Sequence, residues 1–186
     1  MFINQVSYGL RKLAIGILIV LSVPCLTFAF KNEPDGFRGI QWGTTIDTLS
    51  EFVLTGDTHT YTRLYIKKND KKTLGYADLS AITYITYKQQ FCSVMISFSE
   101  LDNFLKIKDT FFNLYGYGDR NSQSVEGYIW IGSKVVITLD YNKLEDNGVI
   151  SYHYWPIATQ IQSDKRVQVP KGSDKKDQVT KGKEDL

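Results

Sequence analysis

Histidine and cysteine are scarce in this chain, which has two of each among its 186 residues. The histidines, His59 and His153, belong to no His-Glu-x-x-His motif, and no paired-cysteine spacing of a zinc site is present. A phosphate-cradling glycine loop and the Gly-x-Ser-x-Gly elbow of hydrolases are also missing. We therefore expect no catalytic residue set, no metal and no cofactor. One enzymatic alternative stays open, a small periplasmic hydrolase that uses His153 or His59.

The N-terminal 29 residues have the three parts of a cleavable secretory signal peptide. A basic end at Arg11 and Lys12 precedes an uncharged, largely apolar run over 13–30, and small residues precede a cut after Ala29. Two alternatives stay open, because the run 13–30 is almost long enough for an uncleaved membrane anchor and Cys25 is a candidate lipidated residue. Cleavage predicts a periplasmic or secreted protein without a membrane span in the remaining chain.

Charge is balanced in this sequence, with 22 basic and 20 acidic residues. Cleavage would remove Arg11 and Lys12 and leave equal numbers of each sign. A neutral chain lacks the basic field of nucleic-acid-binding domains, so we expect no nucleic-acid partner. Cleavage would also leave Cys92 as the one cysteine. Because Cys92, Val94 and Ile96 alternate along one face of a strand, we expect a buried thiol and no intramolecular disulfide.

Apolar patterning predicts an α+β fold. The expected strands are 37–43, 60–67, 79–87, 91–98, 125–131, 134–141 and 149–155, and the expected helices are 44–54 and 100–115. A capping box of Thr44 and Asp47 indicates the first helix, and an apolar stripe that includes Phe104 and Phe111 indicates the second. The order β-α-βββ-α-βββ predicts an antiparallel meandering sheet with two helices packed on one face.

Composition changes near residue 163. The segment 163–186 contains many charged residues and no aromatic ones, which is typical of a disordered tail. We therefore expect a signal peptide over 1–29, a single globular α+β domain over 30–162 and a disordered charged tail over 163–186.

Aromatic residues gather late in the chain. Tyr128 and Trp130 share one face of their strand, and Tyr152 and Tyr154 share one face of theirs. If these faces are exposed, they form a platform for sugar rings or for a partner protein. If they lie under the helices, they belong to the core.

The segment 36–44, Gly-Phe-Arg-Gly-Ile-Gln-Trp-Gly-Thr, follows the expected export signal. It resembles the opening of small, uncharacterised exported proteins of Gram-negative bacteria that carry a Gly-Phe-Arg-Gly-Ile-x-Trp-Gly-Thr-type motif. The resemblance implies a cell-envelope location and no particular activity. Within the motif, Trp42 is expected to anchor the core, and Arg38 is expected to pair with a carboxylate or a ligand. The sequence as a whole favours a non-enzymatic envelope protein that binds a partner protein or a cell-wall glycan.

Overall fold

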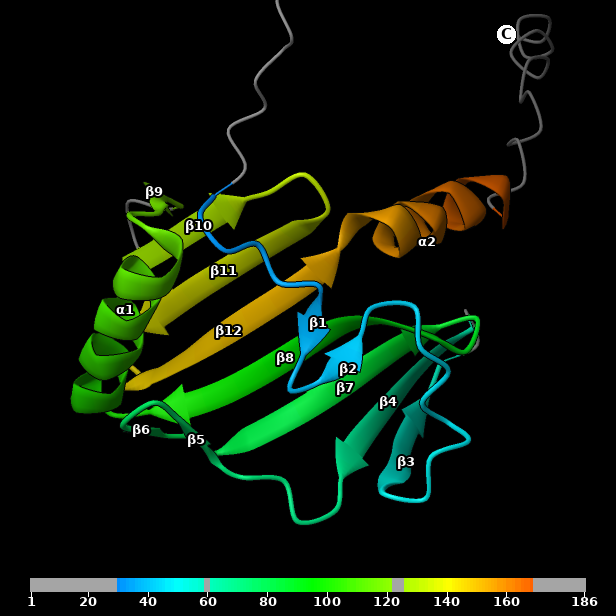
Figure 1. Cartoon of the computed structure of the whole chain (residues 1–186), viewed down its shortest axis with the longest axis horizontal. Coiled ribbons are helices and arrows are strands. Elements are labelled where there is room, and N and C mark those ends of the chain that lie inside the picture. The colour runs from blue at the N-terminus through cyan, green and yellow to red at the C-terminus, as the bar shows by residue number, and fades with distance from the viewer. Residues whose placement is uncertain (1–29, 59–60, 122–125, 169–186) are drawn as a thin grey trace, which may run out of the picture.

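An antiparallel sheet of eight strands dominates the computed structural model, which describes residues 30–58, 61–121 and 126–168 (Figure 1). Its strands lie in the order β3-β4-β7-β8-β12-β11-β10-β9. Their bounds are β3 Phe52–Asp57, β4 Thr62–Lys67, β7 Ala81–Tyr87, β8 Gln90–Ser99, β9 Asp119–Arg120, β10 Glu126–Ile131, β11 Val135–Asn142 and β12 Asn147–Tyr154. Two short hairpins, β1 Gly36–Phe37 with β2 Ile40–Gln41 and β5 Thr73–Leu74 with β6 Ala77–Asp78, and the helices α1 Leu101–Tyr115 and α2 Trp155–Gln168 complete the described elements.

The main core lies between one face of this sheet and the elements that cover it. Tyr84, Val94, Ile96 and Ile150 alternate toward that face and are fully buried. Helix α1 covers one end of the face, and the N-terminal segment with β1 and β2 crosses its middle (Figure 1). The prediction of an α+β fold is therefore confirmed.

Helix α1 occupies the position that the apolar stripe predicts. Phe104, Ile107, Phe111 and Tyr115 are buried at helical spacing, and Gly116 ends the helix with a φ of 85°. No helix among the described residues is both long and apolar enough to cross a bilayer.

The expected helix over 44–54 is wrong. The segment forms turns, in which the N–H of Leu49 donates to the carbonyl of Ile46 at 3.0 Å and the N–H of Phe52 to that of Leu49 at 3.0 Å, and then enters β3. Its start is bonded to β8. The N–H of Gly43 donates to the carbonyl of Phe91 at 2.7 Å, and the N–H of Phe91 donates to the carbonyl of Thr44 at 2.9 Å. Ile46 inserts into the core with 0% of its surface exposed. Tertiary contacts outweigh the local capping signal here. The expected strand over 37–43 is likewise only the short β1–β2 hairpin.

The second helix of the structure is α2, which the sequence analysis did not predict. It crosses residue 163, where the charged tail was expected to begin, and continues to Gln168. Residues 169–186 of that tail and residues 1–29 of the expected signal peptide lie outside the described residues. The apolar contacts of α2 are made mainly by Ile157 and Ile161. Two residues give too weak an amphipathic pattern to predict a helix. Pro156 fits the first helical turn, where its missing N–H costs nothing.

The two helices do not pack on one face, which corrects that part of the fold prediction. Helix α2 contacts Tyr87 and Cys92, which form a small cluster separate from the main core. The cause is an irregularity in β8, where Ile85 pairs with Ser93 and Thr86 pairs with Phe91, so that Cys92 is an extra residue. Cys92 thus points away from the side of Val94. It is buried, as expected, and its burial raises the pKa of the thiol to about 12.

Candidate functional site

Three of the six residues that the sequence offered for binding are core residues. Tyr128, Trp130 and Tyr152 are 8%, 2% and 3% exposed. Their rings pack under α1, with Trp130 at 5.5 Å and Tyr152 at 6.3 Å from the ring centre of Phe111. Of the two alternatives, exposed platform or core, these three residues belong to the core, because α1 covers the strand face that carries them.

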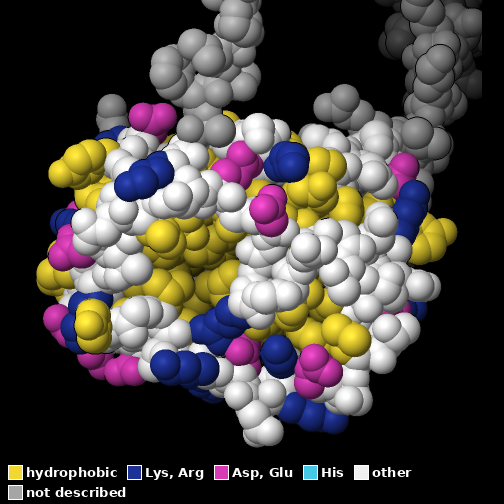
Figure 2. Space-filling model, viewed as in Figure 1, with side chains coloured by type: hydrophobic (Ala, Val, Ile, Leu, Met, Phe, Trp, Pro, Cys, Tyr) yellow, Lys and Arg dark blue, Asp and Glu magenta, His cyan; other side chains and the backbone are white. Residues whose placement is uncertain are grey.

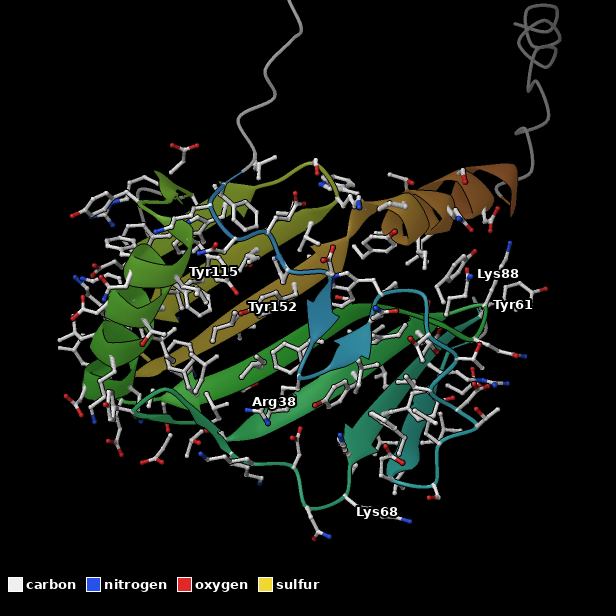
Figure 3. All side chains as sticks on the ribbon, viewed as in Figure 1. Arg38, Tyr61, Lys68, Lys88, Tyr115 and Tyr152 are labelled. Carbon is white, nitrogen blue, oxygen red and sulfur yellow. The ribbon has the colours of Figure 1, made fainter. Side chains whose placement is uncertain are left out.

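Figure 2 shows a hollow with an apolar floor on this side of the molecule, between α1 and the N-terminal segment. Tyr115 and Tyr152 lie next to each other in this region (Figure 3). Their hydroxyl groups are hydrogen-bonded to each other, and burial raises the pKa of both. Since both side chains are at least nine-tenths buried, the hollow exposes little more than the outer surface of the core.

Trp42 and Tyr154 form a half-buried aromatic stack beside the core. The ring of Trp42 lies 4.8 Å from Phe91 and 6.1 Å from Tyr154, nearly parallel to the latter. Its indole N–H donates to the carbonyl of Pro34 at 2.9 Å. The stack fixes the N-terminal segment to the ends of β8 and β12, which agrees with the expected core anchor at Trp42.

Arg38 pairs with a carboxylate of the same chain. Its guanidinium lies 2.6 Å from Asp70 and donates to the carbonyls of Lys71 at 2.6 Å and Thr73 at 2.8 Å (Figure 3). The hydroxyl of Tyr84 donates to the same carboxylate at 2.8 Å, and burial together with this bond raises the pKa of Tyr84. Arg38 thereby ties the β1–β2 turn to the segment before β5.

His153 lies beside Ser93 on the side of the sheet that faces away from α1. Its Nδ1 is 2.9 Å from the hydroxyl oxygen of Ser93, and that hydroxyl donates its hydrogen to the carbonyl of Tyr152 at 2.7 Å. In this arrangement Nδ1 of His153 is the donor, so it does not accept a proton from Ser93. Ser93 is only 5% exposed. The geometry gives no support to a serine nucleophile activated by His153, and His59 lies outside the described residues.

A pocket of about 320 Å³ opens at the end of the sheet where β3 leads toward β4 and β7 turns into β8. Its lining is made by Asp57, Thr58, Tyr61, Arg63, Lys88 and Gln89. Tyr61 and Lys88 lie side by side at this end of the molecule (Figure 3). The N–H of Lys88 donates to the carbonyl of Tyr61 at 3.0 Å, which joins the two walls.

Backbone strain is concentrated in the walls of this pocket. Tyr61, Lys88 and Gln89 have φ values of 60°, 48° and 69°. They are three of the eight non-glycine residues with positive φ in the described part of the chain. A non-glycine residue in this conformation costs on the order of 1–3 kcal/mol, and such residues cluster at functional sites. Lys88 and Gln89 form the two-residue hairpin loop in which Asn-Gly is the preferred pair.

Charged groups in the pocket are paired around its rim. The Nε of Arg63 lies 3.1 Å from Asp57, and one terminal nitrogen lies 3.6 Å from Asp47. The hydrogen bond from Arg63 to Asp57 raises the pKa of the guanidinium. Lys88 lies 2.8 Å from Asp164 of α2. The pocket therefore presents hydrogen-bond donors and acceptors in fixed positions rather than a field of one sign.

Sequence reasoning missed this pocket. The Lys88–Gln90 turn was expected as a hairpin connection, and that prediction is confirmed. No local pattern, however, connects the turn with Asp57 and Tyr61, which come nearly thirty residues earlier. A sequence feature that could have pointed to the pocket is the Lys88-Gln89 pair in a two-residue turn, because Asn or Gly would be less strained at these positions.

In the described ranges, no three histidine, cysteine, aspartate or glutamate side chains are placed so that they could hold a metal ion. No family model, no curated protein and no solved structure matches this chain.

Proposed function

We propose that this protein is a non-enzymatic component of the cell envelope that binds a cell-wall glycan in the pocket between Tyr61 and the Lys88–Gln89 turn. The observation that carries the proposal is the strained geometry of Tyr61, Lys88 and Gln89, whose side chains all line one pocket. Residues that adopt this backbone easily, such as glycine and asparagine, would stabilise the same turns. The presence of larger side chains at these strained positions supports a role for them in binding.

The residue types in the pocket suit a sugar. Tyr61 is 61% exposed, so one face of its ring is free to pack against the C–H groups of a sugar ring. The carboxylate of Asp57 accepts hydrogen bonds, the guanidinium of Arg63 donates them, and the amide of Gln89 does both. Sugar hydroxyls likewise donate and accept. A volume of about 320 Å³ is at the lower end of the range for ligand pockets, which fits one or two sugar rings.

The envelope location is part of the same proposal. It is supported by the basic, apolar and small-residue segments of 1–29 and by the resemblance of the 36–44 motif to exported proteins. Fractionation of the native cells tests the location, and the intact mass of the recovered protein tests cleavage. A mass that corresponds to a cut after Ala29 supports export with cleavage, an uncut chain in the membrane fraction supports the anchor instead, and recovery from the cytoplasm contradicts the envelope location.

The glycan proposal is tested by co-sedimentation of the purified protein with insoluble cell-wall glycan. We expect the wild-type protein to sediment with the glycan and Tyr61→Ala to stay in the supernatant. Tyr76→Ala is the matched control, because Tyr76 is also exposed, at 90%, but lies in the β5–β6 turn away from the pocket. Equal sedimentation of wild type and Tyr61→Ala would contradict the proposed site.

A further inference from the structure

The side of the eight-stranded sheet that faces away from α1 carries exposed apolar residues from one edge of the sheet to the other. We call this side the open face. Along each strand, the residues between the buried core positions point to it. Its most exposed apolar residues are Val53 (38%), Ile66 (45%), Met95 (41%) and Ile131 (57%). Between them lie the half-buried Leu64, Ile85, Ile129 and Val149 and the small hydroxyl residues Thr83, Ser97, Thr138 and Ser151.

Most charged residues of the described strands point to the α1 side, and the exceptions are Asp119 and Asp140 at the β9–β11 edge of the open face. Lys67 lies over the ring of Phe52, and Arg120 lies over the ring of Tyr128, both on the α1 side. Glu126, at the same side, pairs with Lys108 of α1. In the strands that the structure describes, no lysine, arginine or glutamate side chain points to the open face. A solvated face of an antiparallel sheet normally alternates to polar and charged residues, so this pattern indicates an interface.

We propose that the open face is covered by the open face of a second copy of this chain, in a two-fold symmetric, sheet-on-sheet dimer. Two identical faces meet without like-charge repulsion only if little charge of one sign lies where they touch, and the charges Asp119 and Asp140 of this face are confined to its β9–β11 edge, away from Met95. Met95 lies near its centre, since β8 has neighbours on both sides and Met95 pairs with Thr83 on β7 and Ser151 on β12. Its flexible side chain suits packing against a copy of itself.

The area of the open face fits such a dimer. Seven strands spaced about 4.8 Å apart and about 25 Å long cover roughly 850 Å². Helix α2 covers the corner at Tyr87 and Cys92, which leaves roughly 700 Å². Stable specific interfaces bury about 600–1,000 Å² on each partner, so the available face is sufficient but not large. We therefore expect a dimer with a dissociation constant on the order of 10 µM.

Sedimentation velocity at protein concentrations of about 1–100 µM tests the dimer. The measurement uses the protein in the form that the cell produces after any cleavage. We expect the wild-type protein to shift from monomer to dimer in this range. Met95→Lys should raise the dissociation constant at least about tenfold, because two ammonium groups would meet near the two-fold axis. The matched control is Leu105→Lys on α1, which is also 41% exposed, and its dissociation constant should equal that of the wild type.

Folding of the variants is checked by their thermal unfolding. If Met95→Lys does not fold, Ile131→Lys takes its place, because that side chain is 57% exposed and its replacement leaves the core intact. A wild-type protein that stays monomeric at about 100 µM would overturn the proposal. So would a folded lysine variant of the open face that dimerises as tightly as the wild type.

Discussion

The backbone N–H of Lys88 donates a hydrogen bond to the carbonyl of Tyr61 at 3.0 Å, and both residues have positive φ. This bond holds the segment after β3 against the β7–β8 turn and fixes the width of the pocket between them. The pocket residues Tyr61, Lys88 and Gln89 lie in two turns and not in the core of the sheet. Their side chains can therefore be replaced and tested separately from the stability of the sheet.

Replacing Gln89 by glycine should stabilise the protein and weaken glycan binding. Gln89 has a φ of 69°, which glycine adopts without steric cost. We expect the free energy of unfolding to rise by about 0.5–1 kcal/mol. Chemical denaturation measures the change, and co-sedimentation with cell-wall glycan measures the loss of binding.

The control for Gln89→Gly is Asn69→Gly, because Asn69 also has positive φ, at 55°, and lies away from the pocket. Asparagine tolerates this conformation, so its replacement should change stability less and leave binding intact. A Gln89→Gly variant that is less stable than the wild type would show that the turn is not strained.

Helix α2 should loosen when its contact with the pocket is removed. Asp164 accepts hydrogen bonds from Lys88 and from the hydroxyl of Tyr87, and these two bonds lower the pKa of its carboxyl group. In Asp164→Asn, we expect faster amide hydrogen exchange in α2 and unchanged exchange in α1. The same loosening should appear in the wild type as the pH falls through the lowered pKa, because a carboxylate with a lowered pKa stabilises the folded state only while it is ionised. Exchange in α2 that is equally slow in both proteins would contradict this role of Asp164.

The sequence predicted the central part of the fold better than its ends. Strands β7 and β8 and helix α1 were expected because their apolar periods, two and 3.6, are set by the core that they share. The helix expected from Thr44 and Asp47 did not form because the start of the segment is bonded to Phe91 and the rest closes into separate turns. Helix α2 was missed because few of its residues are apolar.

The candidate site depends on contacts that are distant in the sequence, and for that reason it could not be predicted. The aromatic residues that looked like a binding surface, such as Trp130, alternate correctly along their strand. Alternation alone does not tell which face a helix will cover. The structure assigns these residues to the core and places exposed Tyr61 at the pocket instead.

Glu33 should contribute to stability in a pH-dependent way. Its carboxylate accepts hydrogen bonds from the hydroxyl of Ser133 at 2.7 Å and from the backbone N–H groups of Ser133, Lys134 and Val135 at 2.6–3.0 Å. Burial raises the pKa of Glu33, but the hydrogen bonds from Ser133, Lys134 and Val135 outweigh it and hold this pKa below its usual value. The ionised carboxylate therefore fastens the N-terminal segment to the β10–β11 turn.

We expect Glu33→Gln to lower the free energy of unfolding by about 1 kcal/mol at neutral pH, allowing for the partial exposure of the site. The difference from the wild type should be complete above about pH 4.3, the usual glutamate pKa. It should disappear as the pH falls through the lowered pKa of Glu33, because the wild-type carboxylate is then protonated. Glu145→Gln is the control on an exposed loop, and it should show no such difference. A Glu33→Gln effect that stays constant down to acidic pH would contradict the account.

Direct mapping of a bound sugar tests the proposed function most directly. An NMR titration of the isotope-labelled protein with a soluble disaccharide of N-acetylated amino sugars from the cell wall reports which backbone amides sense the ligand. The account predicts saturable shifts at Asp57, Tyr61, Lys88 and Gln89, and their loss in Tyr61→Ala but not in Tyr76→Ala. Saturable shifts confined to another part of the chain, or no shifts at all, would contradict the assignment of this pocket as the glycan site.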